Sequence, residues 1–273
     1  MAVQMVVALA QALNPNLAQY MRQVASLARK MGESMHVEAA QLDQIEMAGL
    51  IHDIGLLSLP KELQLKDPKM LTEEQYRNYC EHPVTGSIIL ESIDSLAEAG
   101  EMVLFHHELL NGKGFPNGLS KDQIPLGAKI LLAASDYCHI IATWPRSMRQ
   151  LVGHARRQLG AEEWKRFAFS QDPESIIEAS AEILLLKDPE GKYDKAVVKA
   201  LIEVIHEDKT TRPTSMVQLD DLKGGMILME DLHLEDGRLL ITRGTKLVAT
   251  TIQTLQGLGT REMISKEIFV SLP

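Results

Sequence analysis

The stretch Ile51-His52-Asp53-Ile54-Gly55 sets an imidazole beside a carboxylate at the point where a run of apolar residues stops. Leucine, isoleucine and alanine recur before it at the 3.6-residue period of a helix, which predicts a helix over 37–52 that ends at this pair. A histidine–aspartate pair alone is a weak signal because it occurs often by chance. Its meaning depends on which other ligand-type residues the chain brings near it.

Further histidines and one aspartate lie at the ends or inside of predicted helices. His82 heads one helix, His106 and His107 end another, and Asp136 lies within an apolar helix. An unpaired buried carboxylate is costly, so Asp136 should face a cation or hydrogen-bond donors. Imidazole and carboxylate together suit iron, manganese, zinc and similar divalent ions. A carboxylate such as Asp53 can bridge two ions, and ions about 3.5–4 Å apart are a common device for phosphate-ester hydrolysis.

The competing interpretation of any single histidine is structural. A lone histidine is more often a surface residue or a hydrogen-bonded core residue than a ligand. We give that interpretation to the histidines without a partner motif, which are His36, His139, His154, His206 and His233. The pair His106-His107 is harder to explain in this way, because a Gly-rich loop follows it at once.

Composition indicates a helical protein in a reducing compartment. Of the 273 residues 45% are hydrophobic but only 4% aromatic, and an aliphatic core favours packed helices. The formal net charge of −9 argues against a general binder of nucleic acid or of anionic membranes. Cys80 and Cys138 form no paired motif, and no apolar run reaches the roughly 20 residues that cross a bilayer. The apolar start, 1–13, is interpreted as a helix and not as a signal peptide, so we expect a cytoplasmic protein.

The pattern along the chain predicts a mainly α fold, a helical domain over 1–208 followed by a small α+β module over 209–273. Asn16 is the expected cap of a first long helix that Gly32 ends, and Thr72 with Gln75 forms a capping box. Further helices are predicted over 37–52, 73–81, 84–94, 96–108, 126–143, 146–158, 173–187 and 193–207. In the module, strands are predicted over 216–219, 226–234, 238–242 and 267–272, with a hairpin turn at 235–237 and a helix over 249–257.

Around its histidines the sequence resembles the HD-GYP family, whose pattern is HDIGK, then a single His, then HHE followed by DGxGYP. The matching stretches are His52-Asp53-Ile54-Gly55, Glu81-His82-Pro83, and His106-His107-Glu108 leading into Asn111-Gly112-Lys113-Gly114-Phe115-Pro116. Flanking residues match as well, including 65–72, 130–136 and Tyr193-Asp194. The resemblance covers about residues 10–205. The segment from Leu222 to Leu247 is similar to one appended to some HD-type response regulators.

This resemblance implies a bundle of helices that holds two or three metal ions, often iron or manganese, and hydrolyses the bacterial messenger cyclic di-GMP. It implies that Asp53 bridges two ions and that His82, His106 and His107 complete one site. His52 and Asp136 would then belong to the other site.

Departures from the family pattern predict that one of these sites is impaired. Tyr20 stands where the family has a histidine ligand, and Leu56 replaces the lysine of HDIGK. Leu109, Asn111 and Phe115 replace the usual Arg, Asp and Tyr of the later motif. We therefore expect one ion to bind well and a second to bind weakly or not at all.

Two functions of different classes follow from these residues. In the first, the chain is a metal-dependent phosphodiesterase in which His52 and Asp53 are catalytic and Lys113 and Arg146 contact a phosphate. In the second, it is an inactive relative that senses a nucleotide or binds a signalling protein. Either way the expected ligand is a small nucleotide or phosphoester, the cofactor is one or two divalent ions, and a homodimer is a further possibility. No nucleic-acid or membrane partner is expected.

Overall fold

In the computed structural model, residues 2–91, 93, 96–145, 148–160, 173–188, 190–211, 214–230, 232–234, 239–241, 247, 249–259, 263–265 and 267–271 are described. The chain divides into two compact units, Met1–Val204 and Ile205–Pro273. The predicted mainly α fold is confirmed. No helix in the described part of the chain combines the length and the apolar character that a bilayer-spanning segment needs.

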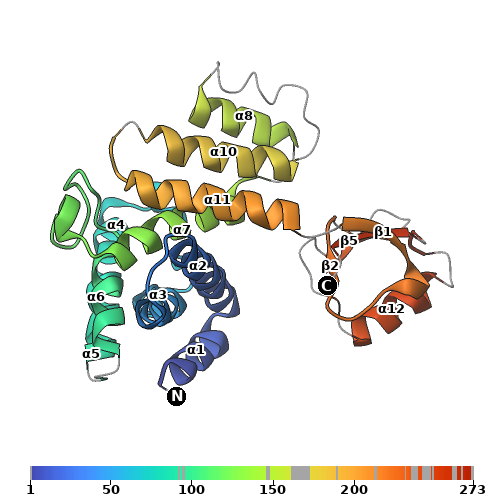
Figure 1. The fold of residues 1–273 in the computed structure, drawn as a ribbon, viewed down its shortest axis with the longest axis horizontal. Helices are drawn as coiled ribbons and strands as arrows, with labels where there is room; N and C mark the ends of the chain where they lie inside the picture. The colour runs from blue at the N-terminus through green and yellow to red at the C-terminus, as the bar shows by residue number, and fades with distance from the viewer. Residues whose placement is uncertain are drawn as a thin grey trace. The chain divides into compact units, whose positions relative to one another are not determined.

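Helices make up the first unit (Figure 1). They are α1 (Ala2–Leu13), α2 (Pro15–Ser34), α3 (Ala39–Ile51), the short 3₁₀ helices η1 (Ile54–Ser58) and η2 (Pro68–Met70), α4 (Glu73–Cys80), α5 (His82–Glu91), α6 (Ala97–Phe105), the 3₁₀ helix η4 (Lys121–Gln123), α7 (Leu126–Thr143), α8 (Met148–Leu159), α10 (Pro173–Lys187) and α11 (Lys195–Thr211). The helix predicted for the apolar start is confirmed as α1.

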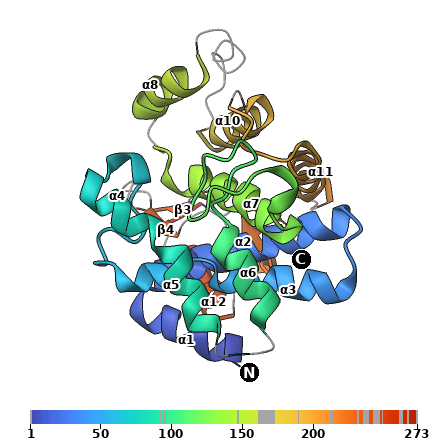
Figure 2. The same cartoon turned by 90° about the vertical axis from the view of Figure 1, so that its left-hand side faces the viewer.

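The centre of this unit is built on α7, which α2 and α6 contact and which carries a long run of buried small and aliphatic residues (Figure 2). Small residues let the helices approach closely. A Cβ added at Gly49 of α3 would lie 2.6 Å from the backbone of Ala25 in α2. The same packing holds η1 against α5, so the residues that follow the histidine–aspartate pair lie beside the helix headed by His82.

Two expectations about the first long helix are wrong. Its cap is Asn14, whose Oδ1 accepts a hydrogen bond from the Leu17 backbone N–H at 3.2 Å, and not Asn16, which is exposed. Pro15 follows directly, in the first helical position, where the missing N–H costs nothing. Gly32 does not end the helix, which continues to Ser34. It packs instead against the Leu42 side chain of α3, where a Cβ would lie 2.6 Å from Leu42 Cδ2.

The predicted capping box of α4 is confirmed. Thr72 Oγ1 accepts from the Gln75 N–H at 3.3 Å, and the Gln75 side chain accepts from the Thr72 N–H at 3.0 Å. The helix therefore begins at Glu73 and ends just before His82, which starts α5 as predicted.

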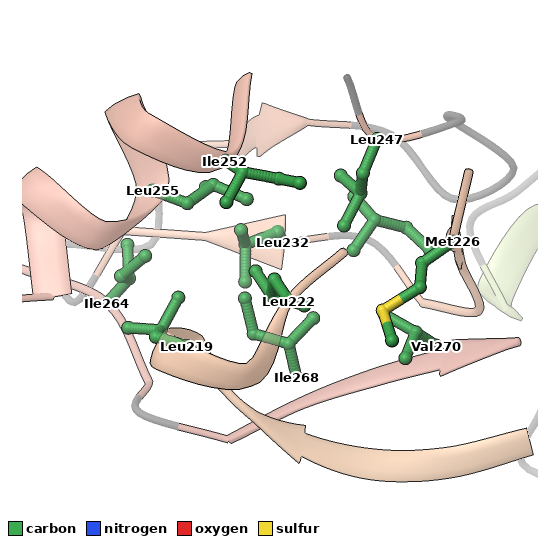
Figure 3. Packing of buried hydrophobic residues seen from close by; sticks show 11 residues of the cluster. Leu219, Leu222, Met226, Leu232, Leu247, Ile252, Leu255, Ile264, Ile268 and Val270 are labelled. Atoms are coloured by element: carbon green, nitrogen blue, oxygen red, sulfur yellow. The ribbon is translucent and has the colours of Figure 1, made fainter. Parts of the chain in front are cut away.

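The second unit holds a three-stranded antiparallel sheet of order β1-β5-β2, made of β1 (Thr214–Gln218), β5 (Glu267–Ser271) and β2 (Ile227–Leu228). A second pair joins β3 (Leu232–His233) to β4 (Leu239–Ile241), and α12 (Ala249–Gly259) covers an aliphatic core (Figure 3). The run 226–234, expected as one strand, is two short strands. The predicted turn 235–237 lies outside the described residues.

The predicted boundary between domains, after residue 208, and the division between the compact units, after Val204, both fall inside α11. The assignment of 1–208 and 209–273 as separate domains stays a prediction.

Candidate metal centre

Four predicted ligands come together at one point of the first unit. The carboxylate of Asp53 and one ring nitrogen each of His82, His106 and His107 all lie within 4.8 Å of one another. Asp53 Oδ1 lies 3.2 Å from His82 Nε2 and 3.6 Å from His106 Nε2, and those two nitrogens are 3.4 Å apart. Residues far apart in sequence thus meet because the end of α3, the start of α5 and the end of α6 converge.

His52 lies beside this group but outside it. Its Nε2 is 3.3 Å from the other carboxylate oxygen, Oδ2 of Asp53, and the ring is fully buried. Its ring packs edge-on against His106 with centroids 5.2 Å apart. The Asp53 carboxylate therefore faces three buried imidazoles, those of His52, His82 and His106.

Backbone carbonyls three residues earlier set which nitrogen each ring presents. Nδ1 of His52, His82 and His106 lies 2.7–2.8 Å from the carbonyl oxygens of Gly49, Tyr79 and Val103, respectively. A carbonyl only accepts, so each Nδ1 carries the proton. In a neutral ring Nε2 then keeps a bare lone pair, and such outer hydrogen bonds are the usual means of orienting a metal-bound histidine.

This arrangement fits a cation. The lone pairs of His82 and His106 face each other and the same carboxylate oxygen, and a single proton cannot satisfy all three contacts. His52 Nε2 is buried without a hydrogen-bond partner among the described residues. A divalent ion bound by imidazole and carboxylate would remove this repulsion, and the donor set suits iron, manganese or zinc.

The pKa values of the clustered side chains also favour binding of a cation. Burial lowers the pKa of His106 to about 4, and burial and its imidazole neighbours hold the pKa of His107 well below its usual value. Burial alone would raise the pKa of the Asp53 carboxyl, but the charge of His52 and the surrounding ring nitrogens hold it well below normal. Near neutral pH the cluster therefore offers neutral imidazoles at His106 and His107 and an ionised carboxylate.

The loop after His107 is held by Glu108, which is buried. Its two carboxylate oxygens accept from the backbone N–H groups of Asn117 at 2.6 Å and Leu119 at 2.8 Å. Phe115 of this loop stacks on the His107 ring with centroids 4.6 Å apart. The loop thus closes one side of the cluster with an aromatic ring.

Asp136, predicted as a second-site ligand, is not a member of the four-ligand group. Its Oδ2 accepts a hydrogen bond of 2.6 Å from the Tyr193 hydroxyl. Tyr20, which replaces an expected histidine, packs its ring against His52 at 5.8 Å, and its hydroxyl lies 2.9 Å from Ser135 Oγ.

A cavity of about 910 Å³ opens beside the cluster. Its wall includes Asp53, His107 and Asp136 together with three lysines and four of the five tyrosines of the chain, which are Lys66, Lys69, Lys192, Tyr20, Tyr76, Tyr79 and Tyr193. The volume lies in the range of small-molecule sites.

Lys113, one of the two predicted phosphate contacts, is not brought into this wall. Lys113 is exposed on the loop, where its N–H donates to Asn111 Oδ1, and it is not among the residues that line the cavity. Arg146 lies outside the described residues.

Sequence reasoning missed several residues of this site. His139 and His154, interpreted as structural, line the cavity. Tyr79 was not singled out, yet its hydroxyl lies 3.3 Å from His107 Nε2. The sequence feature that could have identified Tyr79 is its position three residues before His82. This spacing places both residues on the same side of the helical segment.

A helical domain that gathers an aspartate and three histidines from separate helices defines a class of protein with a candidate metal site. The family model described as "HD domain" matches residues 4–166, more than half of the chain, and the chain therefore belongs to the HD domain family. The resemblance to the HD-GYP type, drawn from the motifs, is confirmed.

Curated relatives are similar over the same region. A protein named "Cyclic di-GMP phosphodiesterase" from Thermotoga maritima is 29% identical over 138 residues, which are 50% of this chain and 37% of the relative. "Cyclic di-GMP phosphodiesterase response regulator RpfG" from Xanthomonas campestris is 28% identical over 150 residues, 54% of this chain and 39% of the relative. A "3'3'-cGAMP-specific phosphodiesterase 1" from Vibrio cholerae is 29% identical over 116 residues, 42% of this chain and 27% of the relative. The chain thus spans well under half the length of these relatives.

Among solved structures, one described as "Bd1817, a HDG"Y"P protein from Bdellovibrio bacteriovorus" matches 75% of this chain and 60% of its own, with a TM-score of 0.52 at 17% identity. This likeness supports the fold.

Proposed function

We propose that this chain is a metal-dependent phosphodiesterase of the HD-GYP type, acting on cyclic di-GMP or a related phosphoester in bacterial signalling, with one well-formed metal site and an impaired second one. The observation that carries the proposal is the convergence of Asp53, His82, His106 and His107 beside a cavity. The names of the relatives supply the substrate class.

Each residue of the cluster has a role in this proposal. Bound divalent metal would polarise a phosphoryl oxygen and lower the pKa of bound water. Asp53, His82, His106 and His107 would hold the ion, and His52, whose Nε2 lies 3.3 Å from Asp53 Oδ2, would pack against the other oxygen of that carboxylate. Phe115, stacked on His107, would exclude water from that side.

The cavity would hold the phosphoester. Lys66, Lys69 and Lys192 in its wall could replace the charge that is absent at Leu56, a residue buried against the aliphatic cluster around Leu17. Lys113 and Arg146 stay predictions as further phosphate contacts.

Two observations favour a second candidate, an inactive domain that senses a nucleotide or binds a signalling protein. Leu56 leaves no lysine beside Asp53, and the Tyr20 hydroxyl is engaged by Ser135. Loss of one contact to transition-state charge commonly costs about 10²–10³ in rate. The nucleotide sensor and the phosphodiesterase predict the same ligand and differ in turnover.

A hydrolysis assay decides between them. The full chain is incubated with cyclic di-GMP and with 3'3'-cGAMP in Mn²⁺ or Fe²⁺, beside Asp53→Ala and the exposed control Asp43→Ala. The phosphodiesterase proposal expects turnover by the wild type and by Asp43→Ala, and none by Asp53→Ala. Equal inactivity of wild type and Asp53→Ala, with the nucleotide still bound, would establish the sensor instead.

The remaining expectations are part of the same proposal. We expect a cytoplasmic protein that responds to a signalling partner and that forms a homodimer. Size measurement of the purified chain in solution checks the last of these.

A further inference from the structure

Asp136 is a half-buried carboxylate that the cluster does not use. It lies in the cavity wall with Asp53, yet its Oδ2 is taken by the Tyr193 hydroxyl at 2.6 Å. That length is typical of a hydroxyl that donates to an ionised carboxylate. Burial raises the pKa of Asp136, and the bond from Tyr193 opposes this rise by stabilising the charged form.

Tyr193 is held in place by its own loop. The Asp188 carboxylate accepts the backbone N–H groups of Lys192 and Tyr193, each at 2.8 Å, and the Lys192 carbonyl accepts from the Leu110 N–H at 3.0 Å. The next residue, Asp194, lies 3.6 Å from the ammonium of Lys129 on α7, the helix that carries Asp136. The Tyr193 hydroxyl is therefore presented to Asp136 by backbone contacts independent of the bond itself.

A second hydroxyl meets the preceding residue of α7. Tyr20 Oη lies 2.9 Å from Ser135 Oγ and 3.1 Å from the Ser135 carbonyl oxygen. The ring of Tyr20 packs against His52, whose Nε2 has no hydrogen-bond partner among the described residues. Tyr20 thus contacts both His52 and Ser135, the residue before Asp136, while Tyr193 contacts Asp136 itself.

We propose that Tyr193 and Tyr20 close the second cation site of this chain: Tyr193 withdraws Asp136, Tyr20 fills the place next to His52, and the chain is limited to one ion. The inference rests on the proposed function only in that the Asp53 cluster binds an ion.

Metal content is the test. The full chain, Tyr193→Phe, Tyr20→His and the double variant are loaded with Mn²⁺, dialysed, and analysed for metal per chain and by Mn²⁺ titration. We expect one ion in the wild type and two in the double variant. Tyr193→Phe, which removes only the hydroxyl, should add a weaker second binding step to the titration. Tyr76→Phe, another tyrosine of the cavity wall, should leave one ion.

The outcomes separate the two claims. Two ions in the wild type would overturn this inference together with the impaired second site, and would leave the proposed phosphodiesterase activity standing. One ion in a double variant with wild-type helical circular dichroism would overturn this inference alone. No ion in the wild type would remove the metal site itself and both claims with it. If the double variant does not fold, the second binding step of Tyr193→Phe decides: its presence supports the inference and its absence overturns it.

Discussion

Backbone carbonyl groups determine which ring nitrogen each of three clustered histidines presents to Asp53. His52, His82 and His106 each place Nδ1 within 2.8 Å of the carbonyl three residues earlier, so each presents Nε2 toward Asp53. This spacing is that of one helical turn, and it arises because each histidine starts or ends a helix. The ligand geometry is thus a consequence of where helices begin and end.

In the neighbouring loop, the Glu108 carboxylate holds the backbone by hydrogen bonds. Replacing it by alanine removes the acceptor of two backbone N–H groups, each a charge-assisted bond. Such bonds contribute about 1.5–3 kcal/mol each, so we expect Glu108→Ala to lower the free energy of unfolding by roughly 3–6 kcal/mol. Urea unfolding measures this loss. Glu101→Ala, an exposed change on α6, should shift the midpoint little, and an equal shift in both variants would contradict the role given to Glu108.

The four clustered residues could be named from the sequence because they lie at the ends of predicted helices and match the HD-GYP motifs. The contact of Tyr193 with Asp136 could not, since it joins residues 57 positions apart. The position of the Tyr193 hydroxyl depends on how the loop that begins at Asp188 folds, and no periodic pattern in the sequence predicts that loop.

Helix α2 begins at a cap that also joins two segments. Asn14 accepts from Leu17 and its amide donates to Gln64 Oε1 at 2.6 Å in a buried contact. Loss of a cap typically costs about 1 kcal/mol and up to about 2, and the Gln64 contact adds to it. Asn14→Ala should therefore lower the unfolding free energy by about 2 kcal/mol, while Asn16→Ala, two residues on and exposed, should lower it little. Thermal or urea unfolding of the pair checks this, and a larger loss for Asn16→Ala would restore the cap predicted from sequence.

The contact between η1 and α5 depends on the absence of a side chain at Gly55. A Cβ there would lie 2.0 Å from the His82 carbonyl oxygen and 2.9 Å from the Gly86 nitrogen, both backbone atoms that cannot turn aside. Gly55→Ala should destabilise the unit by about 1–3 kcal/mol and weaken Mn²⁺ binding, because it separates Asp53 from His82.

Gly153→Ala in α8 is the matched control. A Cβ there meets only the end of the Arg157 side chain at 3.5 Å, and alanine favours a helix by about 1 kcal/mol over glycine. Stability should hold or rise and Mn²⁺ affinity should stay unchanged. Unchanged Mn²⁺ affinity in Gly55→Ala would show that the η1–α5 approach does not position the ligands.

Helix existence was predictable wherever the apolar period was long, as in α7, whose predicted range 126–143 is the observed one. The ends of helices depend on single polar residues, so the sequence predicted Asn16 as the cap of α2 where the cap is Asn14. The run 226–234 looked like one strand because its residues are mostly apolar, but the chain bends at Met229 and Glu230, between β2 and β3.

Each compact unit has an aliphatic core of its own. Among the described residues, the buried members of the second unit's core lie within 219–270 and include Leu228, Leu255 and Val270. A fragment that keeps α11 whole, residues 1–211, should therefore fold and bind Mn²⁺ with the affinity of the full chain. Circular dichroism and Mn²⁺ titration check this. A fragment that is unfolded or that loses the ion would show that the helical unit needs residues beyond 211.

The central claim is that one cation is held by Asp53, His82, His106 and His107. Crystals of the full chain loaded with Mn²⁺ and measured at the manganese absorption edge test it most directly. We predict one strong anomalous peak within bonding distance of the Asp53 carboxylate and the three imidazoles. No peak at that position, or a main peak bound by His52 and Asp136 instead, would contradict the account.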